Sequence, residues 1–143
     1  MTWIRRLANL GPLERRLLPR AVAWIVASRV GLRVLPYRTL SSLLEGASRR
    51  APVSLPCSAE NVNWALGAAA RRLPGTQCLA WALACRSLLG QAGISSELRI
   101  GVARSAEGRL QAHAWVECGG TTFTWGDDER SYAPLASVLG RRP

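Results

Sequence analysis

The hydrophobic pattern of this 143-residue chain changes its period once, and this change limits the folds open to it. Up to about residue 93 the apolar residues recur at helical spacing, whereas from residue 97 apolar and polar residues alternate, as in E-L-R-I-G-V at 97–102. A period near 3.6 residues indicates helices, and a period of two indicates strands. Helices therefore precede strands, which predicts an α+β fold rather than an alternating α/β one.

The first third of the chain is expected to be helical. Residues 13–34 predict one or two amphipathic helices, broken near Pro19 and ended before Pro36, since proline disrupts a helix interior. A shorter helix is expected over 37–48, and a proline-containing linker over 49–56. The apolar residues at helical spacing in the first segment are Leu17, Ala21, Trp24, Ile25 and Val30.

Two further helices are expected after this linker. Ser58 can cap the first of them, with Glu60 in its first turn, and Pro74-Gly75 should end it. Thr76 is the candidate N-cap of the second, a strongly apolar helix from about 77 to 91 that ends at Gly93. We place a domain boundary in the linker, which divides the chain into a helical region over 1–50 and a core over 51–143.

The alternating region predicts an antiparallel meander. A strand at 97–102 is followed by a turn at 105–108 and by a strand that carries Ala114 and Val116 on one face and His113 on the other. Gly119-Gly120 is a hairpin signal, and T-T-F-T-W at 121–125 returns as a third strand. The helix over 77–91 should pack on one face of this sheet. The tail from Gly126 is expected to be loop with a short helix around 134–139.

The charge is unevenly distributed. All 19 basic residues are arginine, against nine acidic residues, so the net charge is +10. Residues 1–50 hold ten Arg and two Glu, whereas residues 51–143 hold nine Arg and seven acids. The basic region could face nucleic acid, an anionic membrane or an acidic protein. No nucleic-acid-binding motif is present, so we expect no nucleic-acid partner.

Location and cofactors follow from what the sequence lacks. The N-terminus has no signal-peptide pattern, and no apolar stretch approaches the roughly 20 residues that span a bilayer, so a cytoplasmic protein is expected. Four widely spaced cysteines without a C-x-x-C pair indicate neither a disulfide framework nor a zinc site. We expect no metal and no cofactor.

Cys78 is the candidate nucleophile, about two positions into its predicted helix. The free N–H groups and partial positive charge of a helix N-terminus stabilise a thiolate and can bind an oxyanion. Cys85 lies deeper on an apolar helix and is expected to belong to the core. His113 is the only histidine, so a general base that titrates near neutral pH can only be this residue.

A third residue should orient the imidazole. If Gly119-Gly120 forms a two-residue turn, residue 118 pairs with residue 121. By the same register, residue 126 lies opposite His113. Asp127 is our choice and Asp128 stays open beside it, although both could belong to a solvated acidic loop. Glu117, on the same strand face as His113, is a weaker candidate.

Several segments, taken in order, resemble a known family: Cys78-Leu79, A-L-A at 82–84, Leu88-Leu89, Gly93-Ile94, L-R-I-G-V at 98–102 and above all A-H-A-W-V-E at 112–117. The chain resembles the lasso-peptide leader peptidases, which belong to the transglutaminase-like, papain-related superfamily of thiol enzymes. The resemblance covers roughly residues 58–140. It implies N-terminal helices followed by a papain-like core, with the nucleophile at the start of a central helix packed on an antiparallel meander.

The resemblance also implies an activity. Family members are Cys–His–Asp endopeptidases that remove the leader from a ribosomally made precursor, which gives Cys78 as nucleophile and His113 as base. The family often has its Asp about twelve residues after the His, where this chain has Trp125, so Asp127 remains our choice for the third member and Asp128 stays open. The split form works with a separate leader-recognition protein, and the lasso cyclase is a further candidate partner. Two alternatives stay open: a non-catalytic module that binds a peptide or protein, and acyl transfer to an amine.

Overall fold

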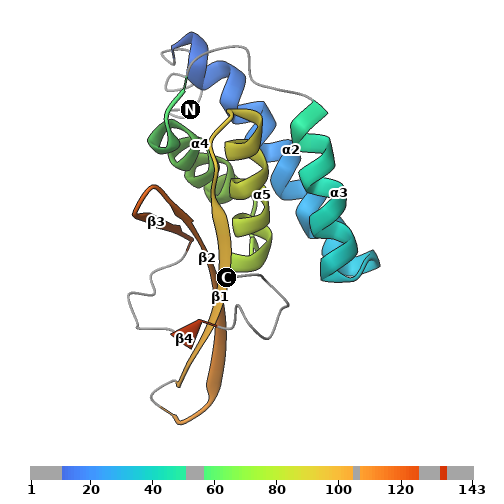
Figure 1. Cartoon of the computed structure of the whole chain (residues 1–143), viewed down its shortest axis with the longest axis vertical. Coiled ribbons are helices and arrows are strands. Elements are labelled where there is room, and N and C mark those ends of the chain that lie inside the picture. Colours follow the sequence, from blue (N-terminus) through green and yellow to red (C-terminus); the bar gives the residue numbers. More distant parts are fainter. Residues whose placement is uncertain (1–10, 51–56, 105–106, 126–132, 135–143) are drawn as a thin grey trace.

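The computed structural model describes residues 11–50, 57–104, 107–125 and 133–134, and it confirms the α+β arrangement (Figure 1). Within these ranges four helices come first, and an antiparallel sheet with the strand order β3-β2-β1-β4 follows. Among the described residues, no helix is both long enough and apolar enough to cross a membrane. The elements are α2 (Pro12–Val34), α3 (Tyr37–Arg50), α4 (Ala59–Arg72), α5 (Cys78–Gln91), β1 (Glu97–Arg104), β2 (Leu110–Cys118), β3 (Thr121–Thr124) and β4 (Ala133–Pro134).

The helix α2 runs unbroken through Pro19, so the predicted break is wrong. An interior proline removes one backbone hydrogen bond and costs about 3 kcal/mol. Leu17, Ala21 and Ile25 flank it with no exposed surface, and their packing keeps the helix continuous. Val30, which the spacing assigned to the same face, is 57% exposed. Its neighbour Gly31 lies in the buried row instead.

The helix α4 begins where its cap predicts. Ser58 Oγ accepts a hydrogen bond from the Asn61 backbone N–H at 3.2 Å, and Asn61 Oδ1 accepts one from the Ser58 backbone at 3.0 Å. This reciprocal pair is a capping box, which satisfies two helix-end donors. The sequence predicted the cap at Ser58 but not its partner Asn61.

The helix α5 begins one residue later than predicted, at Cys78. Gln77, not Thr76, is the N-cap, and the Thr76 hydroxyl donates back to the Leu73 carbonyl at 2.7 Å. The helix ends at Gln91, two residues before the predicted end at Gly93, whose φ of +76° favours glycine. The Ile94 N–H donates to the Leu89 carbonyl at 2.9 Å and thereby closes the last turn.

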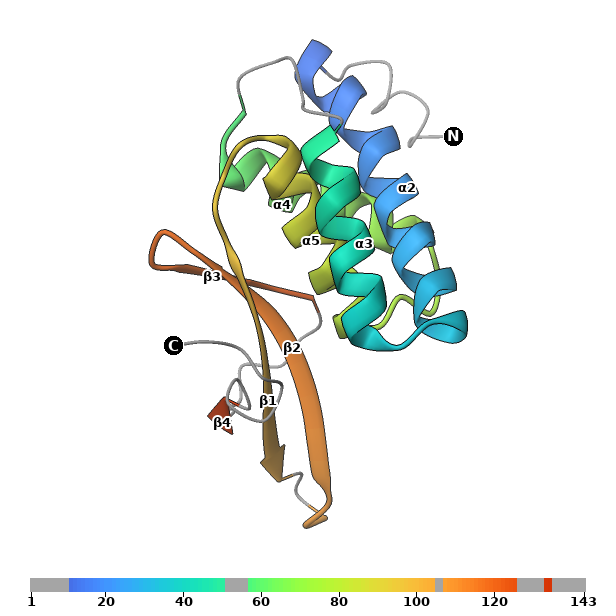
Figure 2. The ribbon, with the colours of Figure 1, turned by 45° about the vertical axis from the view of Figure 1, so that its right-hand side comes forward.

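The strands form the predicted meander. Val116 pairs with both Leu98 of β1 and Phe123 of β3, and all three are buried on the face that α5 covers. The Gly119-Gly120 turn has positive φ at both residues, as a tight two-residue hairpin requires. The β1–β2 hairpin extends beyond the helices (Figure 2).

The chain end differs from its prediction. Ala133 and Pro134 form the short strand β4, which pairs with Val102 and Gly101 of β1. Pro134 therefore belongs to an edge strand rather than to the start of a helix, a position that proline tolerates. The rest of the predicted helix, from 135 on, lies outside the described residues.

One hydrophobic core joins the helices to the sheet. Residues of α2, α4 and α5 share it with Leu98, Val116 and Phe123 of the strands. Trp24 Nε1 of α2 also donates to Gln91 Oε1 at the end of α5, at 2.8 Å. The N-terminal helix is thus part of the support for α5. The domain boundary near residue 50 stays a prediction.

Candidate active site

Cys78 is the first residue of α5, whereas the sequence predicted it about two positions into the helix. Its thiol is free and half-buried, and it packs against the hydrophobic core. The first backbone bond of the helix runs from the Trp81 N–H to the Gln77 carbonyl at 3.0 Å. The N–H groups before Trp81 therefore have no acceptor within the helix, and the first turn contains no acidic residue. This arrangement suits a thiolate or an oxyanion.

Cys85 and Cys57 fit a nucleophile less well. Cys85 has no exposed surface, and burial, with a smaller contribution from Cys118, raises the pKa of its thiol far above the usual range. Burial also raises the pKa of Cys57. Among the residues that the structure describes, no group of three or more His, Cys, Asp or Glu side chains could hold a metal ion.

His113 lies in the middle of β2 and is only 7% exposed. Its Nε2 lies 2.5 Å from Thr124 Oγ1 of β3, and its ring stacks on Trp115 with the centroids 6.3 Å apart. His113 and Trp115 thus share one face of the strand, while Ala114 and Val116 on the other face enter the core. The predicted division of faces is confirmed.

The structure brings the elements of the candidate pair together but does not join their side chains. Trp81, one turn after Cys78, stacks on Trp125 with centroids 6.4 Å apart, and Trp125 directly follows the Thr124 that contacts His113. The first turn of α5 thus lies at the end of β3. Within the part of the chain that the structure describes, no hydrogen bond links Cys78 Sγ to His113. The catalytic pairing stays a prediction.

The third residue is open. Asp127 and Asp128 lie outside the described residues. Glu117 shares the face of His113, but its Oε2 forms an ion pair with Arg99 Nε at 2.7 Å. Because this ion pair already engages one oxygen of the Glu117 carboxylate, Glu117 stays the weaker candidate beside the two aspartates.

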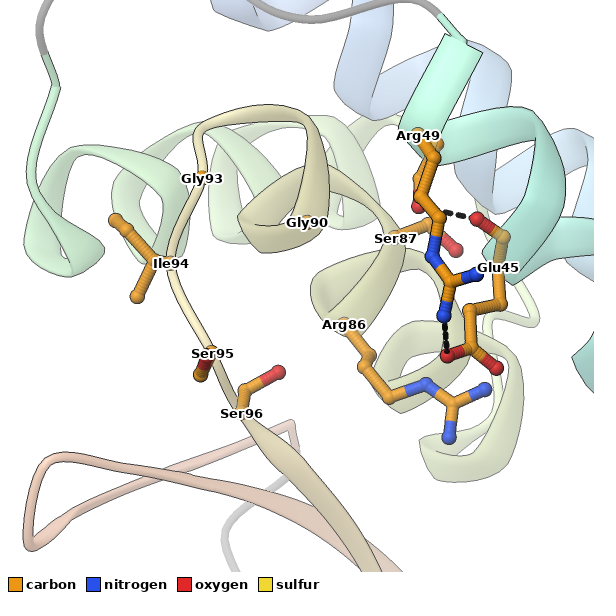
Figure 3. A pocket seen from close by; sticks show the side chains of 10 residues that line it. Glu45, Arg49, Arg86, Ser87, Gly90, Gly93, Ile94, Ser95 and Ser96 are labelled. Carbon is orange, nitrogen blue, oxygen red and sulfur yellow. Dashed lines mark hydrogen bonds and ion pairs between the residues drawn. The ribbon is translucent and has the colours of Figure 1, made fainter.

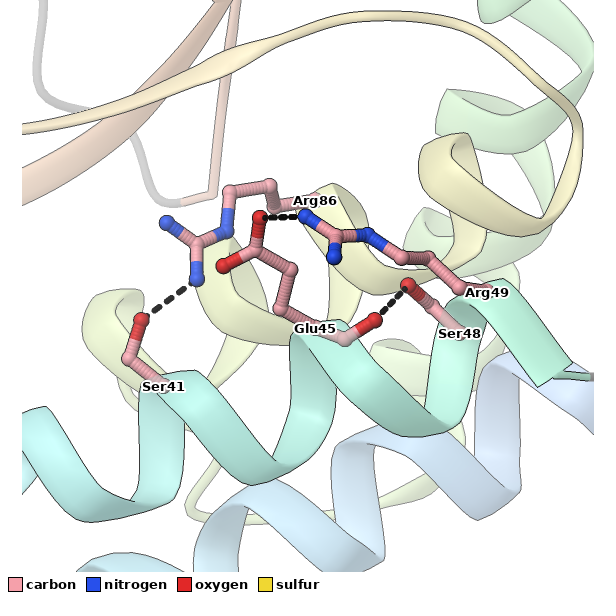
Figure 4. A network of polar contacts seen from close by, with 5 residues as sticks. All are labelled: Ser41, Glu45, Ser48, Arg49 and Arg86. Carbon is pink, nitrogen blue, oxygen red and sulfur yellow. Dashed lines mark hydrogen bonds and ion pairs between the residues drawn. The ribbon is translucent and has the colours of Figure 1, made fainter.

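A cavity of about 320 Å³ lies at the end of α5 farther from Cys78, between α3, α5 and the segment before β1 (Figure 3). Polar contacts of its lining residues include the Arg49–Glu45 ion pair at 2.6 Å, a hydrogen bond from the Ser48 hydroxyl to the Glu45 carbonyl at 2.9 Å and one from Arg86 to Ser41 (Figure 4). The lining contains neither cysteine nor histidine. Its exposed ion pair contributes little to stability.

A second cavity, of about 200 Å³, opens at the start of α5, where Gln77 and Ala80 line it together with Arg29 and Arg33 of α2. These two arginines were not predicted as site residues from the sequence. The only available signal was their four-residue spacing on a helix, and the cavity depends on how α2 packs against α5.

Comparison with known families assigns the chain to a superfamily. A model described as the transglutaminase-like superfamily matches residues 22–137, a range that includes α5 and the strands β1 to β3. Comparisons with curated proteins and with solved structures gave no significant match. The chain belongs to the transglutaminase-like superfamily.

Proposed function

We propose that this protein is a cysteine endopeptidase that removes the leader peptide from a ribosomally made lasso-peptide precursor. The observation that carries the proposal is a free, half-buried thiol at the first residue of α5 in a transglutaminase-like chain. The resemblance of A-H-A-W-V-E at 112–117 to the leader peptidases supports the substrate class.

In this mechanism Cys78 Sγ attacks the scissile carbonyl carbon. A C–S bond forms, and the oxyanion is bound by backbone N–H groups of the first turn of α5. His113 takes the thiol proton and delivers it to the leaving amine as the C–N bond breaks. The released amine is the N-terminus of the core peptide. Water then hydrolyses the thioester and frees the leader as a carboxylate.

Two features support His113 as the base. Its burial shields the ring from bulk water, and the Thr124 hydroxyl contacts Nε2. A histidine whose ring is held by a neighbouring side chain needs little reorganisation during proton transfer. The approach of His113 to Cys78, and its orientation by Asp127 or Asp128, are part of the proposal.

The basic N-terminal region is proposed to contact the leader together with its recognition protein. Removing residues 1–30 would be a poor test, because Leu17, Ala21 and Ile25 belong to the core. Substituting exposed arginines is a milder test, because their side chains lie outside the core. Arg38→Gln combined with Arg50→Gln should weaken binding to the recognition protein–leader complex in a salt-dependent way while the helical content stays constant. If the double variant bound the complex as tightly as the wild type at low salt, this part of the proposal would be wrong.

Cleavage of the precursor tests the nucleophile. The wild-type protein, Cys78→Ala and the matched control Cys57→Ala are each incubated with precursor and recognition protein, and products are identified by mass spectrometry. Cys57 is a second half-buried free thiol, so its substitution should leave cleavage intact. Cys78→Ala should abolish cleavage, and cleavage that persists would refute the proposal.

Product masses also separate the alternatives. A free leader carboxylate indicates hydrolysis, whereas a leader joined to an added primary amine indicates acyl transfer. Binding of the precursor by the wild-type protein without any cleavage would favour a non-catalytic module.

A further inference from the structure

The 200 Å³ cavity at the start of α5 is lined by chain neighbours of the candidate nucleophile, although Cys78 itself is not among its lining residues. Its wall contains Gln77, directly before Cys78, and Ala80, two residues after it. Helix geometry places both Cα atoms within roughly 6 Å of the Cys78 Cα. Its volume is below the roughly 300–1,000 Å³ of pockets that hold whole small molecules, so the cavity suits one side chain.

Two arginines give the cavity its charge. Arg29 and Arg33 stand four residues apart on α2, so their side chains are neighbours on one face of the helix. In the described ranges neither guanidinium takes part in an ion pair, and no acidic residue lines the cavity. Two like charges at this spacing destabilise a helix, and a bound carboxylate would relieve that repulsion.

The loop before α5 lies close to Arg29. A Cβ atom built on Gly75 would lie 3.4 Å from Arg29 Nη2, and Gly75 has a φ of +82° that disfavours other residues. A Cβ at that distance would make only an ordinary contact with the half-buried Arg29, so the positive φ is what favours glycine at position 75. Gly75, three residues before Cys78, and Arg29 line the same cavity.

We infer that Arg29 and Arg33 form a specificity subsite for a carboxylate of the peptide substrate, an Asp or Glu side chain one or two residues from the scissile bond. This inference rests on the proposed function, since it takes Cys78 as the attacking group. An extended peptide advances about 3.3 Å per residue, so a side chain in the cavity belongs to a residue near the carbonyl that Cys78 attacks. Guanidinium pairs bind carboxylates through strong, charge-assisted hydrogen bonds.

Two alkylating reagents of nearly equal size test the subsite. Iodoacetate carries a carboxylate where iodoacetamide carries a neutral amide, and both transfer a two-carbon group to a thiolate with loss of iodide. The ratio of their rates at Cys78 is measured by peptide mass spectrometry at about 0.1 M salt, where screening limits interactions to roughly 10 Å. The proteins are wild type, Arg29→Gln, Arg33→Gln and the control Arg49→Gln, which removes the same charge at the other cavity.

Each subsite substitution should lower the iodoacetate-to-iodoacetamide ratio roughly threefold, the effect expected for unit charges about 6 Å apart in water. Arg49→Gln should leave the ratio unchanged, as should the ratio at Cys57 in every protein. Equal ratios at Cys78 in all four proteins would overturn the subsite while leaving the proposed nucleophile intact. If neither reagent modifies Cys78 in the folded protein, the proposed function fails together with the subsite.

Discussion

Two glycines in neighbouring helices should respond oppositely to the same substitution. In a helix interior, alanine is more favourable than glycine by about 1 kcal/mol. A Cβ on Gly46 of α3 meets nothing within 4 Å, so Gly46→Ala should stabilise the protein by about that amount. A Cβ on Gly31 of α2 would collide with Leu40 Cδ1 and would lie 3.0 Å from Cδ2 and 3.2 Å from Cγ. Because Leu40 is buried, this overpacking should cost about 1–3 kcal/mol.

The net effect of Gly31→Ala is therefore a loss of roughly 0–2 kcal/mol, and the two variants should differ by about 1–3 kcal/mol. Urea unfolding followed by circular dichroism measures this difference, and thermal unfolding should show it as a shift of roughly 3–4 °C per kcal/mol. Adding Leu40→Ala should remove the penalty at Gly31, since the colliding atoms are gone. Equal stabilisation by both alanines would refute the packing of α2 against α3.

Two further measurements test other parts of the structure. Ser58→Ala removes one half of the capping box of α4 and should cost about 1 kcal/mol in urea unfolding, and an unchanged midpoint would show that the cap contributes nothing. The raised pKa of the Cys85 thiol keeps it neutral in the folded protein, whereas the unfolded thiol ionises near pH 8.5. The free energy of unfolding should therefore fall as the pH rises past about 8.5, less steeply in Cys85→Ala, and identical slopes would contradict this burial.

Local patterns predicted most of the fold. The alternation over 97–102, the Gly119-Gly120 turn and the cap at Ser58 depend only on neighbouring residues, and the structure confirms all three. Where tertiary contacts decide, the sequence was insufficient. The core residues around Pro19 keep α2 continuous despite its local preference. The two-residue strand β4 exists through its pairing with β1, which no periodicity in so short a segment can reveal.

In the candidate site, too, features set by local sequence could be predicted, whereas those that depend on tertiary packing could not. The position of Cys78 at a helix start follows from Pro74-Gly75 and the apolar run behind it, so it could be predicted to within a residue. The contact of His113 with Thr124 depends on strand register, which the hairpin turn determines. The cavity with Arg29 could not be foreseen, because it brings together residues almost fifty positions apart in the sequence.

The central claim is that Cys78 attacks the precursor and carries the leader as a thioester. The most direct test is the intact mass of the protein after acid quenching of a reaction with precursor and recognition protein. We predict an adduct with the mass of the leader acyl group that maps to Cys78, is released by hydroxylamine and is absent from Cys78→Ala. An adduct on another cysteine, or cleavage by Cys78→Ala at the wild-type rate, would contradict the account.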